Sequence, residues 1–168
     1  MRPRSTRATA PAVAPRPGPP GLPRLLTGLD SVGDTMTMAE HHAVHGPLPR
    51  VASAELIAAV ERAGLRGRGG ADFPTSVKLR AVAGRRRGPA ALVVNGSETE
   101  PASGKDRLLL TRLPHLVLDG AVLAAEAVGA SEVIIKVDDS LRPVVHALEG
   151  AIAVRSEDRV SFELVAGP

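Results

Sequence analysis

The chain of 168 residues is long enough for one domain with a hydrophobic core, and its 43% apolar content is typical of a globular protein. It contains no cysteine, which excludes disulfide bonds, thiolate metal sites and iron–sulfur ligation by this chain. The net charge of +3 arises in the first 24 residues: once their five arginines are set aside, 16 basic residues face 18 acidic ones, which does not favour a nucleic-acid surface.

The first segment, residues 1–24, contains seven prolines, five arginines and no acidic residue. An arginine-rich start without acids is typical of a transit peptide, but proline opposes the amphipathic helix that such peptides form. We therefore predict a disordered tail over residues 1–24 and a single domain over residues 25–168. The chain has no run of 18 apolar residues, so we expect no direct membrane insertion, and we expect no nucleic acid among its partners.

A short helical segment is predicted over residues 36–44, and Gly46-Pro47 stops it. His41 and His45 are four residues apart, which would place them on one face of this helix. Because a protein metal site needs at least three donors and no third ligand is evident, we expect ordinary surface histidines and no metal site.

A second helix is predicted over residues 53–63. Ser53 has the side chain of an N-cap, apolar residues recur on one face, and Gly64 is a typical stop. This helix leads into the segment 65–78, which reads LRGRGGADFPTSVK.

The segment 65–78 is predicted to begin with a loop, because three glycines within four positions weaken helix and strand alike. Unhindered backbone amides and nearby cations are what a phosphate group needs, so we predict an anion-binding loop. Its glycines and cations are Gly67, Gly69, Gly70, Arg66, Arg68 and Lys78. The alternative is a tight turn with incidental arginines. Phe73-Pro74 then forces an extended path before a helical turn over residues 77–82.

The rest of the chain alternates between strands and helices. Strands are predicted over residues 90–94, 132–137 and 160–165, and helices over residues 105–111, 114–128 and 140–154. This alternation predicts an α/β fold with a mainly parallel sheet and flanking helices. Ligands bind at the carboxyl ends of such strands, so the Asn95-Gly96 stretch is predicted to lie in a functional loop, with plain turn chemistry as the alternative.

Two motifs resemble those of a known family, the FMN- and NADH-binding flavoprotein subunit of respiratory complex I. GRGGADFPTSVKL, residues 67–79, is similar to the family's GRGGAGFPTGLKW, and NGSETEPASGKDR, residues 95–107, is similar to NADEGEPGTFKDR. The two motifs also resemble those of a related family, the C subunit of the Rnf-type ferredoxin:NAD reductases, which has FPT-x-VKL and N-G-x-E-x-E-P in the same places. The resemblance covers roughly residues 39–165.

The resemblance implies a role for each matching residue. The glycine loop would approach the phosphate of FMN, Lys78 would add charge, and Asn95 and Glu98 would lie beside the flavin. Phe73 would stack on the adenine of NADH, and Glu100 would accept hydrogen bonds from the dinucleotide. The loop residues concerned are Gly67, Arg68, Gly69 and Gly70. We expect the two motifs to face one shared cavity, in which hydride passes from NADH to FMN.

Several residues depart from the family pattern and weigh against full FMN and NADH binding. Asp72 stands where the family has glycine, and its β-carbon and negative charge would lie near a phosphate. Ser76 stands at the position of another family glycine, and Ser97 at the position of a family aspartate. The sequence reaches Pro168 before the family's second dinucleotide segment and its four-cysteine iron–sulfur domain. We therefore expect a truncated FMN-binding domain with feeble or absent NADH oxidation on its own. A catalytically inactive docking module is the alternative.

The resemblance also implies partner subunits and a cellular location. The expected partners are other subunits of an NADH dehydrogenase or electron-transfer complex. The expected location is the cytoplasm, peripheral to the inner face of a membrane complex.

Overall fold

The computed structural model describes residues 24–29, 35–67, 71–85, 88, 90–98, 100, 102–155 and 159–167. Its helices are the short 3-10 helix η1 (Arg24–Leu26), α1 (Met38–His45), α2 (Ser53–Arg62), α3 (Thr75–Ala83), α4 (Lys105–Arg112), α5 (Pro114–Val128) and α6 (Arg142–Ala153). Its strands are β1 (Ala91–Asn95), β2 (Glu132–Val137) and β3 (Ser161–Ala166). The predicted tail lies outside the described residues, except for Arg24, which begins η1.

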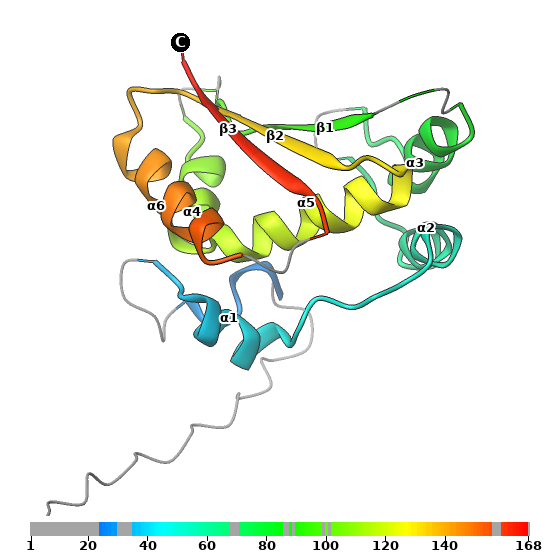
Figure 1. Ribbon diagram of the computed structural model, residues 1–168, viewed down its shortest axis with the longest axis horizontal. Helices are drawn as coiled ribbons and strands as arrows, with labels where there is room; N and C mark the ends of the chain where they lie inside the picture. The colour runs from blue at the N-terminus through cyan, green and yellow to red at the C-terminus, as the bar shows by residue number, and fades with distance from the viewer. Residues whose placement is uncertain are drawn as a thin grey trace, which may run out of the picture.

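The three strands form one parallel sheet in the order β1-β2-β3 (Figure 1). In the register, Val93 of β1 lies opposite Ile134 of β2, which lies opposite Glu163 of β3. The predicted α/β class with a parallel sheet is confirmed. Each predicted strand lies within one residue of its observed position.

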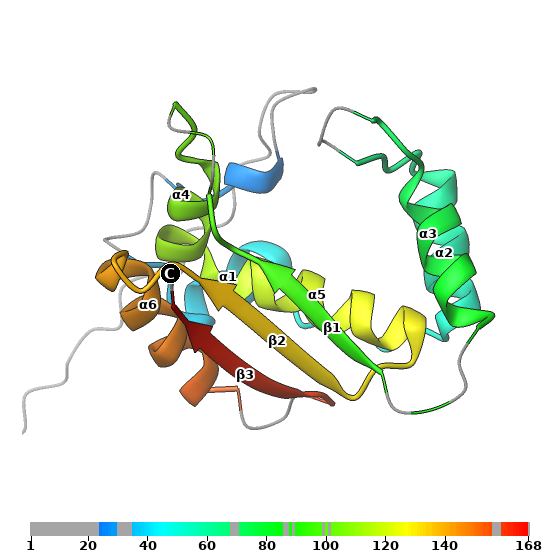
Figure 2. The same cartoon turned by 90° about the horizontal axis from the view of Figure 1, so that it is seen from above.

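Helices α5 and α6 pack under one face of the sheet (Figure 1). Val133, Ile135 and Val137 of β2 point to this face and are fully buried, as the period of two along a strand requires. On the opposite face no described element covers the strands, and Val93 is 64% exposed (Figure 2). Parallel sheets are usually covered on both faces, so this arrangement leaves an apolar surface open.

Helix α5 is the centre of the core, and both of its ends match the prediction. Pro114 occupies the first turn, where its missing amide hydrogen costs nothing, and Gly129 ends the helix with φ of +69°. Leu118, Val122 and Ala125 are fully buried between the sheet and the other helices. No single helix in the described ranges is long and apolar enough to cross a bilayer; the pair α4 and α5 passes that test together but is bent by 98°.

Helices α2 and α3 pack against each other and against α5 at one end of the molecule (Figure 2). The prediction of Ser53 as the N-cap of α2 is wrong: Ala52 is the N-cap, and the Ser53 hydroxyl donates to the carbonyl of Ala127 at 2.5 Å. Serine caps when its oxygen faces the first amides of a helix, and here the contact with α5 takes that oxygen. Helix α3 begins at Thr75, two residues before the predicted turn.

Helix α1 begins at a capping box. The Thr37 hydroxyl accepts from the Glu40 amide at 3.3 Å, and the Glu40 carboxylate accepts from the Thr37 amide at 2.8 Å. The helix packs on α5, on the side away from the sheet (Figure 1). His41 is completely buried in that contact, so the prediction of a surface histidine is wrong for His41, whereas His45 is exposed.

Candidate functional site

The two motifs lie at the same end of the molecule, beyond the carboxyl end of β1 (Figure 2). The first forms the connection from α2 to α3, and the second forms the connection from β1 to α4. This is the edge at which parallel sheets bind ligands. Arg68, Gly69 and Gly70 of the first motif lie outside the described residues, as do residues 99 and 101 of the second.

The glycine loop is closed by its own backbone. The Thr75 amide donates to the Leu65 carbonyl and the Gly67 amide donates to the Phe73 carbonyl, both at 2.9 Å. The prediction that Gly67 offers a bare amide is therefore wrong, because Phe73 already accepts from it. These two hydrogen bonds hold the base of the loop, and Ala71 and Asp72 are the described residues that lie beyond it.

Asp72 occupies an unusual backbone conformation in this loop. It is the one non-glycine residue with a positive φ, 44°, in the described part of the chain. Glycine adopts this region without steric cost, whereas aspartate adopts it with some strain. The carboxylate of Asp72 pairs with Arg66 at 2.7 Å, and both side chains are at least half exposed. The departure from glycine therefore brings a strained backbone and a negative charge that Arg66 partly offsets.

Phe73 and Lys78 stand on the α3 side of the loop. The Lys78 ammonium lies 5.7 Å from the centre of the Phe73 ring, within the range of a cation–π contact. Phe73 is 44% exposed, so much of the ring remains open to solvent. Among the described residues no carboxylate pairs with Lys78, which leaves its charge available for an anion.

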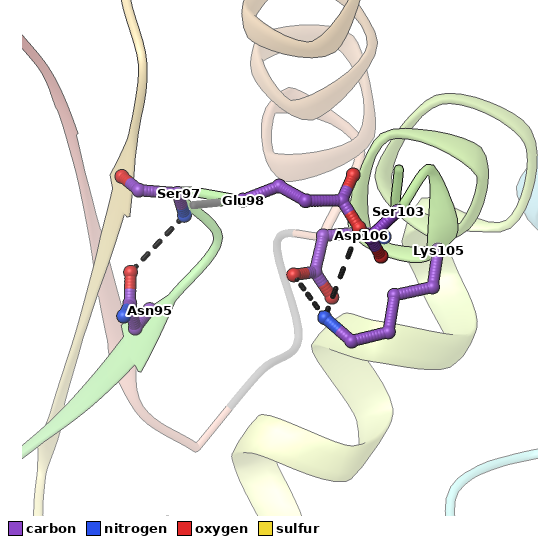
Figure 3. Close-up of polar contacts among 6 residues, drawn as sticks. All are labelled: Asn95, Ser97, Glu98, Ser103, Lys105 and Asp106. Atoms are coloured by element: carbon purple, nitrogen blue, oxygen red, sulfur yellow. Dashed lines mark hydrogen bonds and ion pairs between the residues drawn. The ribbon is translucent and has the colours of Figure 1, made fainter. Parts of the chain in front are cut away.

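In the second motif, the Asn95 side chain and the Gly96 backbone form different hydrogen bonds. The Asn95 side-chain oxygen accepts from the Ser97 amide at 3.0 Å, which turns the chain at the end of β1 (Figure 3). Gly96 is buried, and its amide donates to the Lys136 carbonyl at 2.8 Å. A β-carbon at Gly96 would lie 2.7 Å from Leu110 and 3.1 Å from Val137. The side-chain amide nitrogen of Asn95, on an exposed residue, remains a candidate donor.

Glu98 caps helix α4, which has no capping side chain at Gly104. Its carboxylate accepts from the Ser103 hydroxyl and from the Asp106 amide at 3.3 Å (Figure 3). The hydrogen bond from Ser103 lowers the pKa of Glu98, and the helix amides add to this effect against partial burial. Only 9% of the Glu98 side chain is exposed. Glu98 thus orders the loop, while Glu100 is exposed.

A cavity of about 440 Å³ adjoins the second motif, between α4 and the start of α6. It is lined by Gly104, Arg107, Leu108, Thr111, Arg112 and Pro143. No described residue of the glycine loop lines it. Because parts of both loops lie outside the described residues, a cavity shared by the two motifs stays a prediction.

A buried polar cluster on the far side of α5 was not found from the sequence. His41 Nε2 lies 2.8 Å from one oxygen of Asp119, and Arg155 lies 2.6 Å from the other. The side chains of His41 and Arg155 are 0% and 2% exposed. Burial alone would raise the pKa of Asp119, but hydrogen bonds from His41 and Arg155 hold it below its usual value. The described residues contain no group of three or more ligands that could hold a metal ion.

Residues 60–168 match the family model of the Nuo51 FMN-binding domain. The chain is 41% identical over 98 residues to the F subunit of NADH-quinone oxidoreductase from Streptomyces coelicolor, covering 58% of this chain and 22% of that protein. It is 42% identical over 78 residues to the corresponding subunit from Aquifex aeolicus, covering 46% of this chain and 18% of that protein.

The fold is also similar to a chain of an NAD⁺-reducing [NiFe]-hydrogenase solved in the H₂-reduced state. The TM-score is 0.63 with 36% sequence identity, and the match covers 90% of this chain and 25% of that chain. The air-oxidised form of that enzyme gives a TM-score of 0.62. This chain thus spans a quarter or less of the length of each of these relatives.

Proposed function

This chain belongs to the Nuo51 FMN-binding domain family, and we propose that it is the FMN-binding module of an NADH oxidoreductase, holding the flavin phosphate between its two motif loops. The observation that carries the proposal is the placement of both loops at one end of the sheet (Figure 2). Loops at that end come together over a ligand in open α/β sheets.

The donors on these loops suit a phosphate-bearing cofactor. Lys78 offers an ammonium group whose charge no described carboxylate neutralises, and Asn95 offers a side-chain amide nitrogen beside the turn that its oxygen holds. Both groups donate hydrogen bonds, which is what phosphate oxygens and flavin carbonyls accept. Arg68, Gly69 and Gly70 complete the proposed phosphate site, and the bare Cα of Gly67 allows close approach.

Phe73 and Glu100 are the proposed contacts for NADH. The exposed Phe73 ring offers a flat apolar face for an adenine, and the exposed Glu100 carboxylate is an acceptor for ribose hydroxyls. Glu98 positions the loop that carries both Asn95 and Glu100, since it ties the loop to the start of α4. Bound FMN would supply the ring that accepts hydride from the nicotinamide.

The proposed partners are the other subunits of an NADH dehydrogenase or related electron-transfer complex. The relatives are named as a subunit of NADH-quinone oxidoreductase and as an NAD⁺-reducing hydrogenase. The proposed location is the cytoplasmic face of such a complex. An inactive docking module is the second candidate, which the strained, negatively charged Asp72 favours.

A fluorescence titration of the purified chain with FMN tests the proposal. We expect saturable quenching at micromolar FMN, and about tenfold weaker binding for Lys78→Gln, since loss of one charge-assisted hydrogen bond costs about 1.5 kcal/mol. Arg80→Gln is the matched control, because Arg80 lies on the same helix but pairs with Glu61 at 2.6 Å. Absence of saturable quenching would remove the proposal in favour of a docking module.

The same titration examines Asp72. We expect Asp72→Gly to bind FMN about fivefold more tightly, because the change removes a carboxylate near the phosphate and relieves the positive φ. Stability should change by less than about 1 kcal/mol, since the lost ion pair with Arg66 is exposed. Equal or weaker FMN binding by Asp72→Gly would show that Asp72 does not face the phosphate.

A further inference from the structure

Four histidines gather where α1 packs against α5. The ring centre of His41 lies 5.0 Å from that of His45 and 5.9 Å from those of His42 and His115. We call these four, together with Asp119 and Arg155, the histidine cluster. His115 is 3% exposed, on the first turn of α5. Helix α1 precedes the range 60–168 that matches the family model. The histidine cluster therefore joins helix α1 to the FMN-binding domain.

The cluster contains one buried ion pair, between Asp119 and Arg155. Asp119 carries its one negative charge and Arg155 already supplies a positive charge at 2.6 Å. His41 donates from Nε2 to Asp119, whereas its Nδ1 is buried without a partner. The His41 ring is therefore held in the contact by the Asp119 carboxylate alone among the hydrogen bonds of the described residues.

His115 and His45 resist protonation for related reasons. Burial lowers the pKa of His115 to about 4, and the nearby Arg155, His41 and His42 add to this effect against the attraction of Asp119. The Nδ1 atom of His115 is also buried without a partner. His45 is exposed as a residue, but partial burial of its ring and the neighbouring His41 lower its pKa, against the attraction of Asp119. Separation of α1 from α5 would return His115 to water, where it accepts a proton more readily.

We propose that the histidine cluster is a pH-sensitive latch that holds residues 36–45 on α5 at neutral pH and releases them when the buried His115 takes up a proton. Release would break the hydrogen bond of 2.9 Å from the Met36 amide to the Arg112 carbonyl and uncover the fully buried Met36 and Leu113. The sign follows from linkage: a histidine whose pKa is lower in the docked state favours docking above its free pKa and favours release as the pH falls below it.

Hydrogen exchange read by mass spectrometry measures this release segment by segment. With a free pKa of 6.5 and a docked value of about 4 for His115, we expect protection factors in α1 to fall about 30-fold between pH 7.5 and 5.0. The protection factors of amides in β2 and in the middle of α5 should not change. His115→Phe should reduce the fall to a few-fold. His146→Phe should behave as wild type, because His146 is exposed on α6 and outside the cluster.

Two outcomes in the wild type, and one in the variant, would overturn the latch. One is unchanged protection of α1 across this pH range in the wild type; the other is a parallel loss of protection in α1, α5 and β2, which means global unfolding. Should His115→Phe fail to fold, His115→Gln, which keeps a polar side chain but does not titrate, takes its place. A pH response of α1 that persists undiminished in the folded variant would also contradict the latch.

Discussion

The substitution Asp119→Asn is expected to lower the free energy of unfolding at pH 7 by about 3–5 kcal/mol, the cost of removing one partner from a buried ion pair. The side chain of Arg155 is 2% exposed and would lose its ion pair with Asp119. The neutral amide would also present a donor to His41 or Arg155, both of which donate. Because the chain has no tryptophan or tyrosine, urea unfolding followed by far-UV circular dichroism is the suitable measurement.

Glu126→Gln is the matched control for Asp119→Asn. Glu126 lies on the same helix and pairs with Arg159 at 2.9 Å, but their side chains are 20% and 25% exposed. We expect a loss of about 1 kcal/mol or less for this partly solvated pair. Equal losses in the two variants would mean that the buried cluster around Asp119 adds no special stability.

The substitution Gly96→Ala is expected to destabilise the domain by about 1–3 kcal/mol through overpacking. Its β-carbon would meet Leu110, Val137 and the Lys136 carbonyl oxygen at 2.7, 3.1 and 3.2 Å. The Leu110 side chain can turn away, but the backbone carbonyl of β2 cannot. Displacement of Gly96 would also move the Asn95 turn, so we expect weaker FMN binding in the fluorescence titration.

Gly120→Ala separates packing from the general effect of adding a methyl group. Gly120 lies inside α5, and nothing lies within 4 Å of the β-carbon that it would gain. Alanine favours a helix over glycine, so we expect Gly120→Ala to stabilise the protein by up to about 1 kcal/mol. If Gly96→Ala is equally well tolerated, then the close approach of β1, β2 and α4 at this position is not a constraint.

The elements that sequence predicted well are those with local signals. Pro114 and Gly129 mark both ends of α5, and apolar runs of strand length mark β1, β2 and β3. The threonine and glutamate of the capping box, Thr37 and Glu40, are an equally local signal for the start of α1. That spacing alone indicates a helix that begins at Met38, two residues after the predicted start.

The misses arise where packing between distant residues decides the role of a side chain. Ser53 donates to Ala127, 74 residues away, instead of capping its own helix. His41 and Asp119 are 78 residues apart, and no periodicity in the sequence pairs them. The Gly67 amide is taken by Phe73 because the loop closes on itself. Residue types on the two motifs indicated the family, whereas such contacts require the three-dimensional structure.

The most direct test of the account is an NMR titration of the ¹⁵N-labelled chain with FMN, observed at the Gly67 and Asn95 amides. If both motif loops hold the flavin, signals from both residues shift together and saturate at the same FMN concentration, while Gly120 on α5 remains unchanged. Saturable shifts in one loop only, or none in either, would contradict a single FMN site between them.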